Sequence, residues 1–267
     1  MFLILFNISD KLFILIIKND NYIRYELVII LTLKLRCGVY NNLIIIRGFM
    51  MNYNTLIFDL DGTLLNSLDD LSDSVNYALE KLNYPLRSKE DICSFIGNGI
   101  EKLIELSVPD KTSYDKFAEC LFLFKIHYSK NLRNKTKPYD GIMELLEYLK
   151  ENKYKMAIVS NKFQDGVTEL NDYYFSEYIQ VAIGKSSERR KKPYPDTVLK
   201  AIDDLNSPKD KCLYIGDSEV DFKTARNANI DFAGVAWGFR DKKVLEDLGA
   251  DYIINTPSDL ISILSCE

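Results

Sequence analysis

Hydrophobic and polar positions along residues 139–267 alternate between two periods. Short apolar runs predict buried strands, and apolar residues three or four positions apart predict helices. The predicted strands cover 154–159, 179–183, 211–215, 231–236 and 252–254, and the predicted helices cover 142–151, 164–171, 195–205, 218–228, 241–248 and 257–264. Alternating strands and helices imply a parallel sheet with helices on both faces. We therefore expect an α/β fold with a Rossmann-like, doubly wound parallel sheet.

Residues 67–138 show helical periodicity only. Apolar residues recur at helical spacing from Leu68 to Leu82, and further helices are predicted over 90–95, 100–106 and 114–131. Since no strand pattern appears in this stretch, we expect an inserted α-helical cap domain over 67–138. The predicted core then consists of residues 51–66 and 139–267.

The apolar run 56–58 predicts the first core strand, and two carboxylates follow it. Asp59 and Asp61 are two positions apart, so they point to the same side if the strand continues, and Gly62 permits a turn. Open α/β sheets bind ligands at the carboxyl ends of their strands. Two close carboxylates need a cation or a shared proton between them. The structural alternative is an ordinary Asp-Gly turn.

Two later clusters carry groups that bind anions. Ser160 and Asn161 follow a predicted strand, where a hydroxyl and free backbone amides can hold an anion, although such residues also serve as helix caps. Lys192 ends the basic run 189–192 and stands before two prolines that fix it near a helix start. Charge runs usually lie in solvent, but this is the one basic cluster in an acidic body, and a phosphate site needs such a cation.

The last cluster adds two acids. Gly216 lets the chain turn at the end of the strand expected beside the first one, Asp217 follows it, and Asp221 lies one helical turn further on. Together with Asp59 and Asp61 this gives four candidate metal-binding carboxylates. A hard divalent cation suits such oxygen ligands, and Mg²⁺ is the usual ion where phosphate is bound.

These four clusters, in this order along the chain, resemble the sequence motifs of the haloacid dehalogenase superfamily of phosphotransferases. The match consists of DxDGT at 59–63, a Ser at 160, the Lys of a KPxP element at 192 and GDSxxD at 216–221. It covers nearly all of residues 54–222. The helical insert resembles the C1-type cap of this superfamily, and the cap segment Gly97-Asn98-Gly99 resembles the substrate loop of its phosphoglycolate phosphatases.

The resemblance implies a Mg²⁺-dependent phosphatase acting on a small phosphorylated metabolite, with phosphoglycolate first. It makes Asp59 the nucleophile that forms an aspartyl-phosphate, Asp61 the general acid and base, and Lys192 the cation beside them. Phosphate is expected at Gly62, Thr63, Ser160 and Asn161, and substrate at Gly97, Asn98 and Gly99. The metal ligands are expected to be Asp59, the Asp61 carbonyl and Asp217, with Asp221 acting directly or through water.

Other functions stay open at this stage. A β-phosphoglucomutase-like mutase, a pyrophosphatase or a 5′-nucleotidase could use the same core, and a non-catalytic phosphate-binding module could keep the fold. A mutase cap usually carries an Arg-containing loop, and Arg87 is the one arginine in the cap before Arg133. A binding module would not need Asp61. A dehalogenase would need neither Mg²⁺ nor the second acid.

Charge and composition narrow the partners. The formal net charge is −5, and residues 1–50 carry six Lys/Arg against three Asp/Glu, so residues 51–267 carry −8. An acidic body argues against nucleic acid as the main partner. The five cysteines lack metal-ligand spacing and read as reduced thiols of a cytoplasmic protein. The single histidine, His127, fits a packing role in a helix. Monomer and homodimer stay open.

Residues 1–50 differ from the rest. Their Ile/Leu-rich runs are interrupted by charges and fall short of the ~20 apolar residues of a membrane span, and no signal-peptide pattern is present. Met50 and Met51 stand just before the first core strand, and Arg47-Gly48 matches the codons of a ribosome-binding site read in frame. We expect translation to start at Met50 or Met51, so that residues 1–50 are a non-native or disordered extension. A membrane-associated extension and a genuine extra structural element are the two rival interpretations.

Overall fold

A computed structural model describes residues 53–264 in full and, of the preceding chain, the backbone of 2–8, 11–20, 22–30, 33–34 and 39–40. The chain divides into two compact units, Met1–Asn52 with Ser265–Glu267, and Tyr53–Leu264. Of the described helices, none is both long and apolar enough to cross a bilayer.

The first unit contains short antiparallel sheets. β1 (Phe2–Ile8), β2 (Lys11–Asp20) and β3 (Tyr22–Ile30) form one of them, and β4 (Leu33–Lys34) pairs with β5 (Val39–Tyr40). The expected start at Met50 or Met51 lies outside the described residues. The view of residues 1–50 as a non-native or disordered extension stays a prediction.

The second unit is built on a six-stranded parallel sheet, as predicted. Its spatial order is β10-β9-β6-β11-β12-β13, with the first core strand, β6, in the middle. The strands are β6 (Thr55–Phe58), β9 (Lys155–Phe163), β10 (Val181–Lys185), β11 (Cys212–Gly216), β12 (Asp231–Val235) and β13 (Tyr252–Ile254). The chain runs outward from β6 through β9 to β10 and then crosses back to β11. This reversal creates a switch point at the carboxyl end of β6, where α/β sheets bind ligands.

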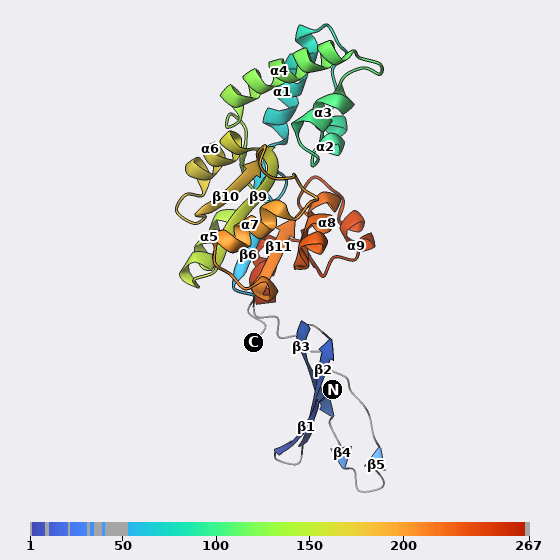
Figure 1. Ribbon diagram of the computed structural model, residues 1–267, viewed down its shortest axis with the longest axis vertical. Helices are drawn as coiled ribbons and strands as arrows, with labels where there is room; N and C mark the ends of the chain where they lie inside the picture. Colours follow the sequence, from blue (N-terminus) through green and yellow to red (C-terminus); the bar gives the residue numbers. More distant parts are fainter. Residues whose placement is uncertain are drawn as a thin grey trace. The chain divides into compact units, whose positions relative to one another are not determined.

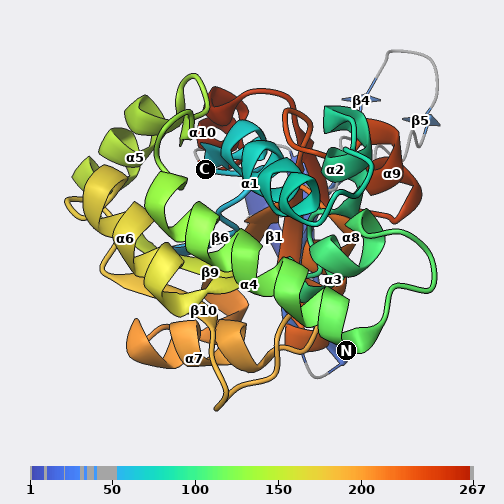
Figure 2. The same cartoon turned by 90° about the horizontal axis from the view of Figure 1, so that it is seen from above.

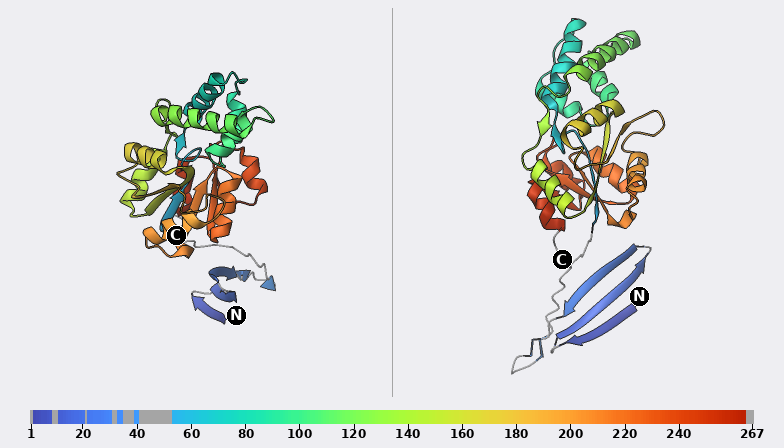
Figure 3. Two further views of the ribbon diagram at one scale, coloured as in Figure 1. Left: turned by 45° about the horizontal axis from the view of Figure 1, so that its top comes forward. Right: turned by 90° about the vertical axis from the view of Figure 1, so that its left-hand side faces the viewer.

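Helices cover both faces of this sheet (Figure 1 and Figure 3). On one face α5 (Ile142–Glu151) packs against α10 (Pro257–Leu264), and α6 (Gln164–Tyr174) packs against β9 and β10. On the other face α7 (Asp196–Asp204), α8 (Glu219–Ala228) and α9 (Lys242–Asp247) lie side by side, with a 3₁₀ turn at Lys209–Lys211 before β11. Their apolar residues form one buried core with the strand residues Ile57, Tyr214 and Phe232.

Four further helices separate β6 from α5. α1 (Leu68–Lys81), α2 (Lys89–Phe95), α3 (Ile100–Ser107) and α4 (Tyr114–Asn131) pack on one another, and Figure 2 shows them above the core. His127 of α4 contacts Ser74 and stacks on Tyr77, both in α1, which is the packing role expected for it. Treating 67–138 as a cap domain stays our proposal for the domain division.

Two short strands that the sequence pattern missed connect these helices to the core. β7 (Leu65–Asn66) pairs antiparallel with β8 (Lys137–Pro138). Just beyond them the buried carboxylate of Asp70 accepts hydrogen bonds from the backbone N–H groups of Lys135 and Thr136 and from the Thr136 hydroxyl, at 2.8–3.0 Å. The two linkers are thereby fixed to each other.

Candidate active site

Asp59 lies at the end of β6, at the switch point of the sheet. Its backbone N–H donates to the Ile215 carbonyl of β11 at 2.9 Å, so the sheet itself fixes its position. The chain then turns sharply, with Gly62 at φ +87° and the N–H groups of Leu64 and Leu65 both donating to the Leu60 carbonyl. The side chain of Asp59 is buried in a cluster that also contains Lys192, Asp217 and Asp221.

Lys192 is a fully enclosed cation in this cluster. Its ammonium lies 2.8 Å from Asp59 Oδ1 and 2.7 Å from Asp221 Oδ1, and it donates to the Tyr214 hydroxyl at 3.1 Å. Burial by itself would lower the pKa of Lys192, but the charges of Asp221 and Asp59 raise it well above its ordinary value. Of the basic run 189–192, this is the lysine that turns inward. Arg190 pairs with Asp196, and Lys191 donates to the Asn98 carbonyl at 2.7 Å.

Asp59, Asp217 and Asp221 together form a buried carboxylate cluster. One oxygen of each lies within 4.8 Å of the others. Burial, then the charge of Asp221, raises the pKa of Asp59 to about 7 against the opposing effect of Lys192. Burial and the charges of Asp221 and Asp59 also raise the pKa of Asp217 well above its ordinary value. The cluster holds more negative charge than Lys192 neutralises.

Asp221 differs from the other two acids in its partners. It closes a capping box with Ser218 at the start of α8, accepting from the Ser218 hydroxyl at 2.5 Å, and it also accepts from the Tyr214 hydroxyl at 3.0 Å. With Lys192 these contacts occupy both of its oxygens. Among the described residues, Asp217 accepts a single hydrogen bond, from the Phe239 N–H at 2.7 Å, and so keeps more free acceptor capacity for a cation.

Glycines allow the backbone to approach these acids closely. A Cβ on Gly62 would lie 2.4 Å from Asp217 Oδ2, and one on Gly216 would lie 2.5 Å from Asp221 Cβ. A side chain at either position would displace a carboxylate of the cluster. Gly62 was expected to bind phosphate, and the structure shows that its small size also makes room for Asp217.

Gly62→Ala is therefore expected to cost both stability and activity. The positive φ alone destabilises an L-residue by about 1–2 kcal/mol, and moving Asp217 should reduce turnover roughly 100-fold, as misplacement of a catalytic group does. Gly249→Ala is the matched control, because Gly249 has φ +77° and nothing lies within 4 Å of its added Cβ. It should lose stability but keep turnover. Thermal unfolding and kcat of both variants test this, and equal loss of turnover in the two would contradict it.

Asp61 lies apart from the three-carboxylate cluster and has partners of its own. Its Oδ2 lies 2.9 Å from the ammonium of Lys162, and its Oδ1 accepts from the Ser67 hydroxyl at 2.5 Å. Lys162 is only 5% exposed and also donates to the hydroxyl of Tyr128, on α4, at 2.6 Å. Lys162 had no predicted role, because the strand was expected to end at residue 159 and the burial of Lys162 depends on Asp61 and Tyr128.

Ser160 and Asn161 lie within β9, which continues to Phe163, so the predicted end of this strand at residue 159 is wrong. The Ser160 hydroxyl accepts from the Lys162 N–H at 3.1 Å and borders the cavity described below. The Asn161 side chain donates to the Gly97 carbonyl at 3.0 Å and accepts from the Lys192 N–H at 2.8 Å. It therefore links the 97–99 segment to Lys192.

Gly97 and Gly99 border the same cavity, whereas the Asn98 side chain is not part of its lining. The segment is held to the core by Lys191, Asn161 and Arg240, whose guanidinium donates to the Ile96 carbonyl at 2.7 Å and to the Cys93 carbonyl at 3.1 Å. Arg240 was also missed from the sequence. Thr63 is buried beside the site, and its hydroxyl has no hydrogen-bond partner among the described residues.

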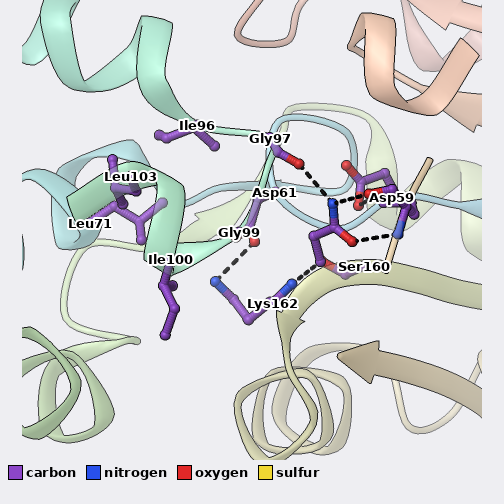
Figure 4. A pocket seen from close by; sticks show the side chains of 12 residues that line it. Asp59, Asp61, Leu71, Ile96, Gly97, Gly99, Ile100, Leu103, Ser160 and Lys162 are labelled. Atoms are coloured by element: carbon purple, nitrogen blue, oxygen red, sulfur yellow. Dashed lines mark hydrogen bonds and ion pairs between the residues drawn. The ribbon is translucent and has the colours of Figure 1, made fainter. Parts of the chain in front are cut away.

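The cavity between core and helices joins these groups (Figure 4). It measures about 50 Å³. Its core side carries polar groups and its helical side carries apolar ones, and the lining consists of Asp59, Asp61, Ser160, Asn161, Lys162 and Lys192 against Leu71, Ile96, Gly97, Gly99, Ile100 and Leu103. Since one water needs about 10–15 Å³ by this measure, the cavity has room for a few water molecules.

The chain is similar in sequence and fold to proteins of one hydrolase family. The family model of haloacid dehalogenase-like hydrolases matches residues 56–235. A phosphoglycolate phosphatase of Aquifex aeolicus is 32% identical over 211 residues, which cover 78% of this chain and 95% of that protein. A pyrophosphatase PpaX of Listeria innocua is 31% identical over 216 residues, which cover 80% of this chain and 97% of that protein. A crystal structure from Haemophilus somnus, described as a predicted phosphoglycolate phosphatase, has a TM-score of 0.75 at 28% identity and covers 80% of this chain and 99% of its own.

Proposed function

The chain belongs to the haloacid dehalogenase-like hydrolase family, and on that premise we propose that it releases phosphate from a small phosphorylated metabolite, with phosphoglycolate as the first candidate. The observation that carries the proposal is the small cavity bordered by Asp59, Asp61, Ser160 and Lys192. It offers a nucleophile, a second acid, a hydroxyl and a cation to one phosphate group. The phosphoglycolate and pyrophosphate-hydrolysing relatives support the substrate class.

In the proposed reaction a carboxylate oxygen of Asp59 attacks phosphorus and forms an aspartyl-phosphate as the bond to the leaving oxygen breaks. Asp61 gives its proton to that oxygen and then takes one from the water that hydrolyses the intermediate. Ser160, Lys192 and the backbone N–H of Asn161 stabilise the charge on the phosphate oxygens. The 2.8 Å contact with Lys192 favours the ionised form of Asp59 that attacks.

Mg²⁺ fits the carboxylate cluster, because buried carboxylates in excess of the available cationic charge need a hard divalent ion. We propose Asp59, Asp217 and the Asp61 carbonyl as ligands. Asp221 is proposed to act by holding Lys192 and Tyr214, since those contacts already occupy it. The bound ion would supply charge stabilisation to the phosphate oxygens.

Stabilisation by Mg²⁺ should increase with pH. A carboxyl whose folded pKa is raised binds its proton more tightly in the folded state, so its contribution to stability is complete below the unfolded value near 4 and is lost as pH rises to about 7. Mg²⁺ competes with that proton. Between pH 8 and pH 6 we expect its affinity to fall roughly 10-fold, and the rise in Tm on adding Mg²⁺ to shrink accordingly. Asp217→Asn should remove the Mg²⁺ effect, and equal shifts at both pH values would refute it.

Ser160→Ala should lower kcat roughly 100-fold, as the loss of one transition-state hydrogen-bond donor does. The Ser160 side chain is buried beside the phosphate position, so the change leaves the exposed surface unchanged. Ser160→Thr keeps the hydroxyl and is the control, for which we expect at most a small loss. Steady-state kinetics at saturating substrate decide this, and equal rates for Ala and wild type would remove Ser160 from the site.

Phosphate release by the full chain with Mg²⁺ tests the function. The panel contains phosphoglycolate, pyrophosphate, nucleoside monophosphates and hexose phosphates. We expect phosphoglycolate to have the highest kcat/KM, with pyrophosphate as the second candidate that the PpaX relatives favour. The helical side of the cavity, with Leu71, Ile96, Ile100 and Leu103, offers no polar side chain to the base or sugar of nucleotides and hexose phosphates. A preference for either of those would overturn the proposed substrate, and no release from any of them would overturn the proposed function.

We propose the cytosol as the compartment. Cys93, Cys120 and Cys212, the described cysteines, are all free thiols. Burial raises the pKa of Cys120 and of Cys212 to about 11, so neither is a reactive thiolate near neutral pH. Free thiols persist where the environment is reducing.

A further inference from the structure

Lys162 is a buried cation at the wall of the cavity, and the proposed reaction gives it no role. Its ammonium contacts Asp61 at 2.9 Å and the Tyr128 hydroxyl at 2.6 Å, and the Tyr128 ring centroid lies 4.8 Å away. A buried charge is costly unless it is fully paired. An ammonium has three N–H donors, and within the described residues these contacts use two. One donor remains for a ligand.

The position of Lys162 along the cavity indicates which part of a ligand it can meet. Asp59 marks the phosphorus, and Asp61, as the proposed acid, marks the oxygen of the leaving group. Figure 4 shows Lys162 on the side of Asp61 away from Asp59, and Lys162 contacts the hydroxyl of Tyr128 on the helix α4. Atoms beyond the leaving oxygen therefore come within reach of Lys162.

No other lining residue can neutralise an anion in that part of the cavity. The residues that border it carry two positive charges, Lys162 and Lys192. Lys192 is committed to Asp59, Asp221 and Tyr214. The helical side is apolar, with Leu71, Ile96, Ile100 and Leu103. A charged leaving group would be desolvated there without compensation unless Lys162 received it, and an apolar surround strengthens such a contact.

We propose that Lys162 determines specificity by binding an anionic group on the leaving part of the substrate. This rests on the proposed phosphatase function and deepens it, since the substrate class becomes phosphomonoesters and anhydrides whose leaving group carries a carboxylate or phosphate close to the bridging oxygen. Neutral alcohols and sugars lack that group. Tyr128 and Asp61 hold the ammonium in place, so the site is formed when α4 lies against β9.

The experiment compares phosphoglycolate with its neutral isostere, carbamoylmethyl phosphate, which differs by an amide in place of the carboxylate. For the wild-type full chain with Mg²⁺ we expect a kcat/KM ratio of roughly 10–100 in favour of the acid, as for a hydrogen bond between charged groups. Lys162→Met should bring that ratio to about 1 by lowering kcat/KM for the acid. The ratio is the decisive quantity, because a displaced Asp61 would lower kcat/KM for both substrates by the same factor and leave their ratio unchanged.

Three further variants separate specificity from folding. Lys162→Arg keeps the charge and should retain a ratio well above 1 even if Lys162→Met unfolds. Tyr128→Phe removes one of the two groups that hold the ammonium but leaves the ion pair with Asp61, and should lower the ratio while leaving it above 1. Lys200→Met removes an exposed lysine of the core that pairs with Asp204, and should leave the ratio at the wild-type value.

Each outcome has one interpretation. A ratio unchanged in Lys162→Met, or equal loss on both substrates, would overturn the role of Lys162 while leaving the phosphatase function intact. A wild-type protein that cleaves pyrophosphate but not phosphoglycolate would overturn the proposed substrate alone. The role of Lys162 would then be supported if Lys162→Met lost activity on pyrophosphate relative to methyl phosphate. A wild-type preference for hexose phosphates, or no activity on any substrate, would overturn both.

Discussion

Asp59→Asn abolishes phosphate release, with an expected fall in kcat by a factor of roughly 10⁴ or more, because an amide cannot attack phosphorus and form the covalent intermediate. No neighbouring acid can take over. Asp221 is held by Lys192, Tyr214 and Ser218, and the free acceptor capacity of Asp217 is proposed to serve the metal ion. Acid-quenched reactions should contain phosphorylated protein for the wild type and none for the variant.

The same substitution should not harm the fold, and this separates loss of chemistry from loss of structure. Burial and the Asp221 charge raise the pKa of Asp59 to about 7, so its ionised form costs stability above that pH. The amide removes that cost. Without metal at pH 8, Asp59→Asn should therefore have a Tm equal to or above that of the wild type. Residual turnover near the wild-type rate would remove Asp59 from the mechanism, and a large drop in Tm would contradict the electrostatic account.

The local parts of the fold could be predicted from the sequence. The helix expected over 114–131 is found at Tyr114–Asn131, since its start is set by a local signal, the Ser113 side chain that accepts from the Lys116 N–H. The helix over 142–151 and the strand over 252–254 also match. Apolar periodicity and capping act within a few residues, so they are visible without any tertiary information.

Features that depend on distant contacts could not be predicted. A two-residue pair such as β7 with β8 has no periodicity, and it forms because the two linkers of the inserted helices meet. β9 runs through Ser160 and Lys162 because β10 pairs beside it, with Lys185 opposite Phe163. Lys162 is tolerated there because Asp61 and Tyr128, 101 and 34 positions away, surround its charge.

The candidate site shows the same division. The carboxyl ends of parallel strands lie at one edge of a sheet, and for that reason the sequence alone could predict that Asp59 and Asp217 lie close together. Within the basic run 189–192, only the fold decides that Lys192 turns inward and Lys191 reaches Asn98. The roles of these residues in catalysis stay proposals, and the variants described here test them.

Lys192→Met is expected to have the largest effect on stability. Lys192 is 2% exposed and is the cation between Asp59 and Asp221. Removing one partner of a buried ion pair leaves an uncompensated charge and costs roughly 3–5 kcal/mol. Phosphate release should disappear as well, because the proposed phosphate site loses its cation. Urea unfolding in the absence of Mg²⁺ measures the stability change.

A double-mutant cycle with Asp221→Asn shows whether the cost comes from the ion pair. If it does, Lys192→Met with Asp221→Asn should lose less stability than the sum of the single variants, by roughly 1–3 kcal/mol, because the second change removes the charge that the first left unpaired. The exposed pair Lys200 and Asp204 on α7 is the matched control, and its cycle should show coupling of only about 0.5 kcal/mol or less. Strict additivity at Lys192 and Asp221 would mean that Lys192 stabilises the core by packing rather than by its charge, and the electrostatic account of the carboxylate cluster would fail with it.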